Sequence, residues 1–206
     1  MTPRVRAGRG AFTLVELLIV IAIVGVLAAT ISGVLGVASK RGKVAKCAGN
    51  LRQLTAATML YAADNDAALP LTGDAPYASP PWYNPVASYV GSGMKTGSTI
   101  ALDPGKASAN KIFQCPGYTG AVVREVSYAP SVTWTNNRIN RISRMSRKIW
   151  LVTSTDSYSV NSSGLQRFNF PYSGDKAQVA FFDGHTELLS RAELTALGSA
   201  PFTTTD

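Results

Sequence analysis

The chain has 206 residues, of which 46% are hydrophobic and 16% charged, and its formal net charge at pH 7 is +8. This length accommodates one membrane segment and one modest domain, and it leaves no room for a second large domain. Arg4, Arg6 and Arg9 supply three of the positive charges, so a chain beginning at Phe12 would carry only +5. Much of the apparent basicity is therefore a signal of membrane topology.

A continuous apolar segment, residues 12–38, follows these arginines and contains Glu16 as its only charge. As a helix it would be roughly 40 Å long, enough to cross a hydrocarbon core of about 30 Å with some tilt. Inserting an unpaired carboxylate into a membrane as part of such a segment costs about 2.5–3.5 kcal/mol, so we expect Glu16 to have a functional role. The alternative is a chance acidic residue in an ordinary membrane anchor. A secretory signal ending at Val37-Ala38-Ser39 is disfavoured, because its apolar core would have only about 7–15 residues.

The sequence Phe12-Thr-Leu-Val-Glu16, with the apolar residues after it, resembles the prepilin leader of type IV pilins and of type II secretion pseudopilins. The resemblance implies that residues 1–11 are a basic leader, which a membrane peptidase removes by cutting between Ala11 and Phe12. It also implies that the new amino group of Phe12 is methylated. Glu16, the fifth mature residue, would then meet the N-terminal amine of a neighbouring subunit in a filament.

The family usually has glycine before the cut, whereas this chain has Ala11 there and Gly10 one place earlier. An ion pair between a freed amine and Glu16 would be favourable in low dielectric, where an unpaired charge is expensive. Such a pair would set the axial register of one subunit against the next. Lateral packing of the apolar helices would provide most of the adhesion.

The charges that flank the apolar segment conflict over its orientation. Five basic residues follow it, against three arginines in the leader: Lys40, Arg41, Lys43, Lys46 and Arg52. The positive-inside rule would place this far flank in the cytoplasm. The resemblance implies the opposite, a single pass through the bacterial inner membrane with the leader in the cytoplasm and the globular domain in the periplasm or outside the cell. We expect the second arrangement, because the motif is more specific than a charge count.

The helix is expected to continue beyond the apolar segment. Spacings of three and four residues form a single stripe: Val44, Cys47, Leu51, Leu54, Thr58 and Tyr61. This pattern predicts an amphipathic helix that packs its stripe against a domain. The other faces are expected to carry Lys43, Lys46, Asn50, Gln53 and Ala57. Asp64-Asn65-Asp66 and Pro70 are stop signals, so we expect a helix over 12–64 and a globular domain over 65–206.

The sequence changes character between Leu69 and Asn110, where prolines alternate with aromatic residues. The prolines are Pro70, Pro76, Pro80, Pro81 and Pro85, and the aromatic residues are Tyr77, Trp82, Tyr83 and Tyr89. We expect a long ordered loop with the aromatic rings packed beneath it, and a short helix near Pro85–Val90. Ligand binding by these rings is the less favoured alternative.

The remainder predicts an antiparallel sheet. Four runs are rich in β-branched and aromatic residues: 119–129, 148–153, 178–182 and 186–189. Asp183-Gly184 predicts a hairpin turn between the last two runs. Ser190 and Glu193 predict a capping box for a short helix that ends near Leu197. The fold class is therefore α+β, with a long N-terminal helix packed on a small antiparallel sheet in a pilin-like arrangement.

Asp183-Gly184-His185 also resembles the C-terminal motif of a prepilin-like subgroup that is abundant in some environmental bacterial phyla. Four further segments share this resemblance: Lys46-Cys47, Asn50-Leu-Arg-Gln-Leu54, Tyr61 with Asp64-Asn65, and Phe113-Gln-Cys115-Pro116. The subgroup also has a histidine ten positions before Asp-Gly, where this chain has Ser173. A role for a histidine pair, metal binding included, is therefore not carried over.

Cys47 and Cys115 are the only cysteines in the chain. Outside the cytoplasm they could form a disulfide that staples the long helix to the segment before the sheet. The loop-entropy model gives about 4 kcal/mol for such a closure. Two buried free thiols are the alternative, and a metal site is disfavoured because the chain has a single histidine.

Catalysis has little support, because any triad would have to use His185 beside a hairpin turn. We expect no enzyme, no metal and no cofactor. Six residues could offer oxygens to calcium, as in some pseudopilins, but none has the spacing of a calcium loop and turn or cap roles are favoured: Asp64, Asn65, Asp66, Asp103, Asp156 and Asp183.

Arginines recur at every third position between residues 138 and 148. The run comprises Arg138, Arg141, Arg144 and Arg147, with Ile139, Ile142 and Met145 repeating beside them and Lys148 after them. A solvated basic ridge over an apolar stripe is the simpler interpretation. The alternative is an anion-binding ridge for DNA, lipid headgroups or an acidic partner subunit.

We therefore expect a non-enzymatic structural subunit of a type II secretion-like pseudopilus. By the resemblance, its partners are the prepilin peptidase, other pilin or pseudopilin subunits and the lipid of the inner membrane. A type IV or DNA-uptake pilin is the alternative within the same class, with nucleic acid as a weakly supported partner. The alternative from another class is a membrane-tethered binding module or enzyme that merely uses a prepilin-like anchor.

Overall fold

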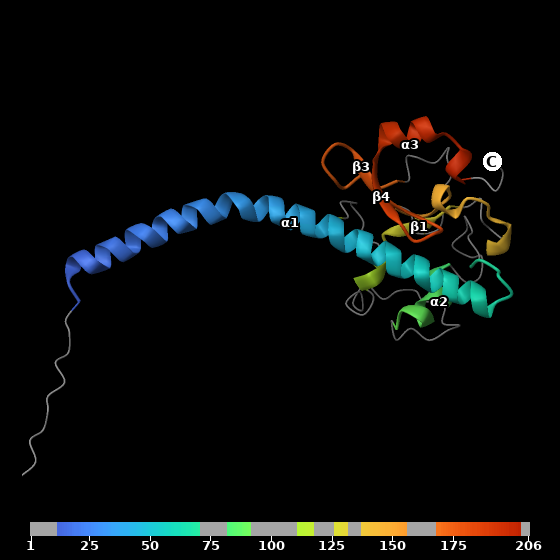
Figure 1. Cartoon of the computed structure of the whole chain (residues 1–206), viewed down its shortest axis with the longest axis horizontal. Helices are drawn as coiled ribbons and strands as arrows, with labels where there is room; N and C mark the ends of the chain where they lie inside the picture. Colours follow the sequence, from blue (N-terminus) through green and yellow to red (C-terminus); the bar gives the residue numbers. More distant parts are fainter. Residues whose placement is uncertain are drawn as a thin grey trace, which may run out of the picture. The chain divides into compact units, whose positions relative to one another are not determined.

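The computed structural model describes residues 12–70, 82–91, 111–117, 126–131, 137–155 and 168–202, with the side chains of residues 30–35 left aside. The chain divides into two compact units, Met1–Arg41 and Gly42–Asp206. A long N-terminal helix is followed by short helices and a four-stranded antiparallel sheet (Figure 1). The predicted α+β class is confirmed.

Helix α1 extends over Leu14–Asp64 and has 51 residues, which confirms the helix expected over 12–64. It contains no proline, so its ladder of backbone hydrogen bonds is not interrupted. In the first unit, every residue from 12 to 29 is exposed, including large apolar side chains on all sides of the helix. Within the described residues, the structure has no helix that combines the length and the apolarity needed to cross a membrane.

In the second unit, α1 buries most of the predicted stripe, whereas Val44 and Tyr61 are only half-buried. Cys47, Leu51, Leu54 and Thr58 are all fully buried. Asn50 and Ala57, which we expected on other faces, are also buried, at 1% and 2% exposure. The buried face is wider than one stripe because the helix packs on the segment 111–117 as well as on the sheet, and the Asn50 amide donates hydrogen bonds to backbone oxygens of that segment.

The helix ends where its stop signals lie. Its last residue is Asp64, and Asp66 and Ala67 adopt positive φ angles of 51° and 62°. The backbone N–H of Ala67 donates to the carbonyl of Ala62, and the Asn65 amide donates to the carbonyl of Tyr61. Carbonyls left open at the helix end are therefore satisfied by the turn that stops it.

The sheet is a meander in which each strand pairs with the next along the chain, in the order β1-β2-β3-β4. The strands are β1 (Tyr128–Pro130), β2 (Ile149–Thr153), β3 (Lys176–Phe181) and β4 (Thr186–Ser190). Three of the predicted runs are confirmed to within two residues. Of the run 119–129, only its end lies in the described part of the chain, where β1 extends it to Pro130.

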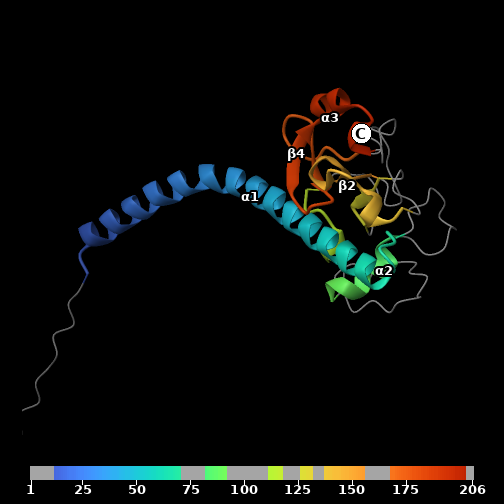
Figure 2. The same cartoon turned by 45° about the vertical axis from the view of Figure 1, so that its right-hand side comes forward.

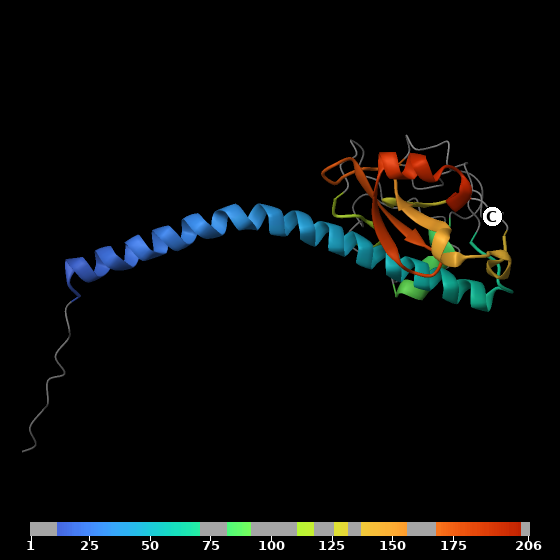
Figure 3. The same cartoon turned by 45° about the horizontal axis from the view of Figure 1, so that its top comes forward.

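Two core clusters lie on the two faces of the sheet. One contains residues of α1 and of the short helix α2 (Tyr83–Ala87) together with Tyr128, Trp150 and Ala180. The other contains Val179 and Phe181 of β3 together with residues of helix α3 (Arg191–Leu197) and the C-terminal turn. Figures 2 and 3 show the strands between the second half of α1 and α3. The sheet is therefore covered on both faces, which explains why all five residues of β2 are buried.

The short helix expected near Pro85–Val90 is present. It consists of α2 (Tyr83–Ala87) followed by the 3-10 turn η1 (Ser88–Val90). The ring of Trp82 meets those of Phe113 and Trp150 edge to face, at centroid distances of 6.1 and 6.5 Å. The packing role predicted for Trp82 and Tyr83 is therefore confirmed, whereas Tyr77 lies outside the described residues.

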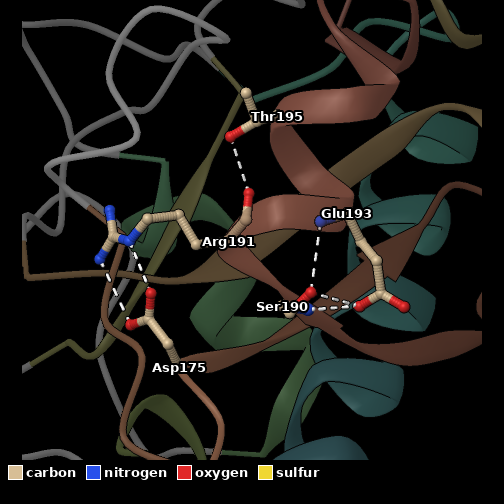
Figure 4. Close-up of polar contacts among 5 residues, drawn as sticks. All are labelled: Asp175, Ser190, Arg191, Glu193 and Thr195. Carbon is tan, nitrogen blue, oxygen red and sulfur yellow. Dashed lines mark hydrogen bonds and ion pairs between the residues drawn. The ribbon is translucent and has the colours of Figure 1, made fainter.

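The predicted capping box starts helix α3 (Arg191–Leu197), as Figure 4 shows. The Glu193 backbone N–H donates to the Ser190 hydroxyl, and the Ser190 backbone N–H donates to the Glu193 carboxylate at 2.7 Å. Arg191 pairs with Asp175 at 2.7 Å and lies over the Phe170 ring, 4.0 Å from its centroid. These contacts attach the start of α3 to the segment in front of β3, and the turn η7 (Ala200–Phe202) follows α3.

Candidate assembly site and buried thiol cluster

The predicted assembly residue, Glu16, lies in the first turn of α1 and forms a capping box with Thr13. The Thr13 backbone N–H and hydroxyl both donate to Glu16 Oε2 at 2.9 Å, and the Glu16 backbone N–H donates to Thr13 Oγ1 at 3.3 Å. In a single chain the Glu16 carboxylate therefore satisfies the Thr13 backbone N–H, and the Thr13 hydroxyl satisfies the Glu16 backbone N–H that the helix start leaves open. The sequence carried this signal as Thr-x-x-Glu before an apolar run, and sequence reasoning missed it.

The residues around this capping box are apolar and exposed. Phe12 is 79% exposed, Leu14 78% and Val15 64%. A helix that is apolar on all sides is expected to be buried by other apolar groups, either lipid or neighbouring helices. This surface therefore lacks its partner in the isolated chain. Ala11, the other residue of the predicted cleavage site, lies outside the described residues.

A second cluster, the thiol cluster, lies deep in the globular unit and contains Cys47, Cys115, Tyr128, Tyr172 and Asn50. The two cysteines are free and buried, and their thiols are hydrogen-bonded to each other. The Tyr128 hydroxyl donates to Cys47 Sγ at 3.4 Å, and the Tyr172 hydroxyl lies 3.1 Å from Cys115 Sγ. The Asn50 amide donates to the Tyr128 hydroxyl at 3.4 Å. The pairing of Cys47 and Cys115 as a disulfide remains a prediction.

The two thiols differ in acidity. Burial raises the pKa of Cys47 far above its ordinary value, because the interior disfavours a thiolate. The hydrogen bond from Cys47 lowers the pKa of Cys115 to about 7, with smaller contributions from the Tyr172 hydroxyl and the Gly117 backbone N–H. Cys115 is therefore the thiol of the pair that loses its proton first.

The thiol cluster also joins segments that resemble the prepilin-like subgroup. Cys47 and Asn50 come from α1, and Gln114 and Cys115 come from the segment 111–117. The Asn50 amide donates to the carbonyls of Gln114 at 2.9 Å and Lys111 at 3.2 Å. Tyr128 and Tyr172 belong to none of these segments, and sequence reasoning gave no signal for them.

The Asp-Gly-His motif forms the β3–β4 turn. Gly184 has φ +90°, and the His185 backbone N–H donates to Asp183 Oδ1 at 3.1 Å. The His185 ring stacks on Phe181 at a centroid distance of 4.1 Å, with Nδ1 2.5 Å from Asp183 Oδ1. These contacts describe a turn in which the motif residues hold one another in place, as the turn and cap interpretation of Asp183 predicts.

The arginine run forms two 3-10 turns, η4 (Ile139–Arg141) and η5 (Met145–Arg147). The two turns do not form one continuous helix, because Ile142 between them is extended and Arg144 adopts a left-handed conformation with φ 48°. The arginines at 138, 141, 144 and 147 are exposed, whereas Ile142 is buried. Lys148 differs from the rest of the run: it is 3% exposed, and its Nζ donates to the Ala200 carbonyl at 3.1 Å.

A cavity of about 440 Å³ lies between η5, the β3–β4 hairpin and the C-terminal turn, with Arg144, Arg147 and Lys148 among its lining residues. Glu187 and Phe181 line it too, so it combines both charges with apolar surface. Among the described residues, no group of three or more His, Cys, Asp or Glu side chains is placed to hold a metal ion. Asp103 and Asp156, named as possible calcium ligands, lie outside the described residues.

The N-terminal region matches a known family model. Residues 6–32 match the prokaryotic N-terminal methylation motif, the prepilin-type signature of type IV pilins and pseudopilins. This match covers the residues of the proposed cut and Glu16, and it supports a type IV pilin-like subunit that is processed as a prepilin. No curated protein and no solved structure matches the chain significantly.

Proposed function

We propose that this chain is a structural subunit of a type II secretion-like pseudopilus, cleaved between Ala11 and Phe12, methylated at Phe12 and assembled through α1. The observation that carries the proposal is an apolar helix that is exposed on all sides and has Glu16 in its first turn, inside the matched methylation motif. We propose that residues 12–38 are stored in the bacterial inner membrane, with the globular unit outside the cytoplasm. Their apolar sequence, with one carboxylate, supports this storage.

Two chemical roles of Glu16 have to be separated. Its carboxylate caps the helix within the chain through Thr13. In a filament it would also pair with the freed amine of a neighbour, which relieves an otherwise costly charge among apolar side chains. The pairing requires the negative charge, whereas capping requires only an acceptor oxygen.

The test of processing is the intact mass of the full chain from bacterial membranes, with and without an active prepilin peptidase. Loss of residues 1–11 with gain of one methyl group supports the proposal. An unprocessed chain, or a cut near Ser39, would overturn it and favour a membrane-tethered binding module or enzyme.

The test of assembly compares three variants in co-purification of differently tagged subunits. Glu16→Gln keeps an acceptor for Thr13 but loses the charge, so it should abolish assembly, as should Glu16→Ala. Thr13→Ala keeps the charge and loses only the cap, so it should still assemble. Assembly by Glu16→Gln at the level of the unchanged chain would contradict the proposed ion pair.

A DNA-uptake pilin is the second candidate, favoured by the four exposed arginines of the run 138–147. Basic side chains that follow one side of a surface attract phosphate groups, and such binding weakens steeply with salt. Binding of duplex DNA by the full chain in detergent, lost when Arg141 and Arg147 become glutamine, would favour this candidate. Absence of salt-sensitive binding would leave the secretion pseudopilus as the better assignment.

A further inference from the structure

The thiol cluster places the only two cysteines of the chain in contact across distant segments. Cys47 lies in α1, 0% exposed, and Cys115 lies after the 3-10 turn that precedes β1, 4% exposed. Their thiols share a hydrogen bond, so the two sulfurs are already neighbours in the folded chain. Closing a bond between them therefore requires a small approach of two groups that the fold has brought together.

The surroundings of the two sulfurs stabilise a thiolate to different extents. Four groups form hydrogen bonds that favour the thiolate of Cys115: the Cys47 thiol, the Tyr172 hydroxyl, the Gly117 backbone N–H and the Tyr128 hydroxyl. Tyr172 reaches this sulfur because residue 117 is glycine, since a Cβ there would lie 2.7 Å from Tyr172 Cε1. Donors that converge on a sulfur stabilise its negative charge. Cys47 is more deeply buried, and although the hydroxyls of Tyr128 and Tyr172 both reach its sulfur, burial is the larger effect and disfavours its thiolate.

We propose that Cys47 and Cys115 form a redox-closed staple, in which Cys115 is the attacking thiolate and Cys47 the resolving thiol. The oxidant is an external disulfide, such as oxidised glutathione or the disulfide of an oxidant protein. The product is one internal disulfide that ties α1 to the segment in front of β1. This chemistry goes beyond the filament function and does not depend on it.

The exchange proceeds in two balanced steps. The Cys115 thiolate attacks one sulfur of the external disulfide, a mixed disulfide forms, and the other external sulfur leaves as a thiolate that takes up a proton. Cys47 then loses its proton and attacks Cys115 Sγ, which expels the second external thiol. Two thiols of the chain are oxidised by two electrons, and the external disulfide is reduced to two thiols.

The staple would act where the long helix joins the globular unit. Residues 47 and 115 enclose α2 and the end of α1, so the closed loop restricts a large part of the unfolded chain. A loop of this size is expected to raise the unfolding temperature of the globular unit on the order of 10 °C. The oxidised chain would therefore hold α1 on the sheet more firmly than the reduced chain.

The experiment uses the full chain, purified reduced in mild detergent and then treated with oxidised glutathione under native conditions. We expect the intact mass to fall by two hydrogens, both thiols to become inert to N-ethylmaleimide after unfolding, and the unfolding temperature to rise. If both thiols remain alkylatable, or if the disulfide forms only in urea, the staple is overturned. Thiol state is read separately from processing at Phe12, so failure here does not bear on the proposed function.

Matched single variants test the order of attack. Cys47→Ser keeps a hydroxyl beside Cys115 and should trap the mixed disulfide of glutathione on Cys115. In Cys115→Ser, Cys47 should react with oxidised glutathione at least about tenfold more slowly at neutral pH than Cys115 does in Cys47→Ser, because the thiolate of Cys47 is scarce. Equal rates in the two variants, or faster reaction of Cys47, would overturn the assignment of Cys115 as the attacking thiol.

Discussion

The indole Nε1 of Trp150 donates a hydrogen bond of 3.1 Å to Oγ1 of Thr58, which joins the middle of the sheet to α1. Both residues are fully buried, and the Thr58 hydroxyl donates in turn to the Leu54 carbonyl at 2.9 Å. The position of α1 on the sheet is therefore determined by a directional contact as well as by apolar packing. A polar contact of this kind tolerates no sliding of the helix without leaving a donor unpaired.

Thr58→Val should remove the acceptor of Trp150 while keeping the volume of the side chain. A buried donor left without a partner costs about 1–3 kcal/mol, so the free energy of unfolding should fall by that amount. Urea unfolding of the full chain, followed by tryptophan fluorescence, measures the change. Thr58→Ser keeps the hydroxyl and should lose less, and equal stability of the valine variant and the unchanged chain would contradict the prediction.

Two glycines with open space around them, Gly184 in the β3–β4 turn and Gly49 inside α1, give a matched pair of substitutions. Gly184 has φ +90° with nothing near its Cβ position, so Gly184→Ala should lose about 1–2 kcal/mol through backbone strain alone. Gly49 lies inside α1 with equally open space, and Gly49→Ala should gain about 0.5–1 kcal/mol through its helix preference. Opposite signs in urea unfolding are the expected result, and a shared sign would show that side-chain crowding decides instead.

The capping box of α3 predicts a loss of stability in acid. Hydrogen bonds from the Ser190 backbone N–H and hydroxyl lower the pKa of Glu193 below its ordinary 4.5. Because this pKa is lower in the folded chain than in the unfolded chain, the ionised carboxylate stabilises the fold above pH 4.5. That stabilisation is lost as the pH falls through the pKa of the folded chain. Unfolding measured across this pH window should show the loss in the unchanged chain and a smaller loss in Glu193→Gln. Identical pH profiles for the unchanged chain and for Glu193→Gln would contradict a stabilising role of the Glu193 carboxylate in the capping box.

The acidity of Cys115 should depend on its neighbour. Cys47→Ala removes the hydrogen bond that is the largest cause of the lowered pKa, so the pKa of Cys115 should rise from about 7 towards its ordinary 9.0 or beyond. Cys47→Ser retains a donor and should keep the pKa lower than the alanine variant does. The pH dependence of alkylation by iodoacetamide measures both values. Both variants leave Cys115 in the same buried position, so a difference between the two pH profiles reports the hydrogen bond from residue 47. If Cys115 has the same pKa in the alanine and serine variants, the other hydrogen-bond donors are sufficient to lower it and the prediction is wrong.

Local features of this protein could be predicted because each depends on residues close in sequence. The α1 helix follows from apolar periodicity without proline, the β3–β4 turn from Asp183-Gly184, and α3 from the Ser190 capping box. Thr13 and Glu16 carried an equally local signal that sequence reasoning overlooked. The part of the run 119–129 before Val126 lies outside the described residues, so that part of the prediction remains untested.

The long helix, the α+β class and the prepilin-type start could be predicted from the sequence, because periodicity, turn chemistry and a contiguous motif are properties of neighbouring residues. The burial of Asn50 and Lys148, and the packing of Tyr128 and Tyr172 around Cys47 and Cys115, became visible in the folded chain alone. Tyr128 lies 81 positions after Cys47, and Tyr172 lies 57 positions after Cys115. Their meeting depends on which faces of α1 and the sheet pack together, and that choice is made by the whole core at once.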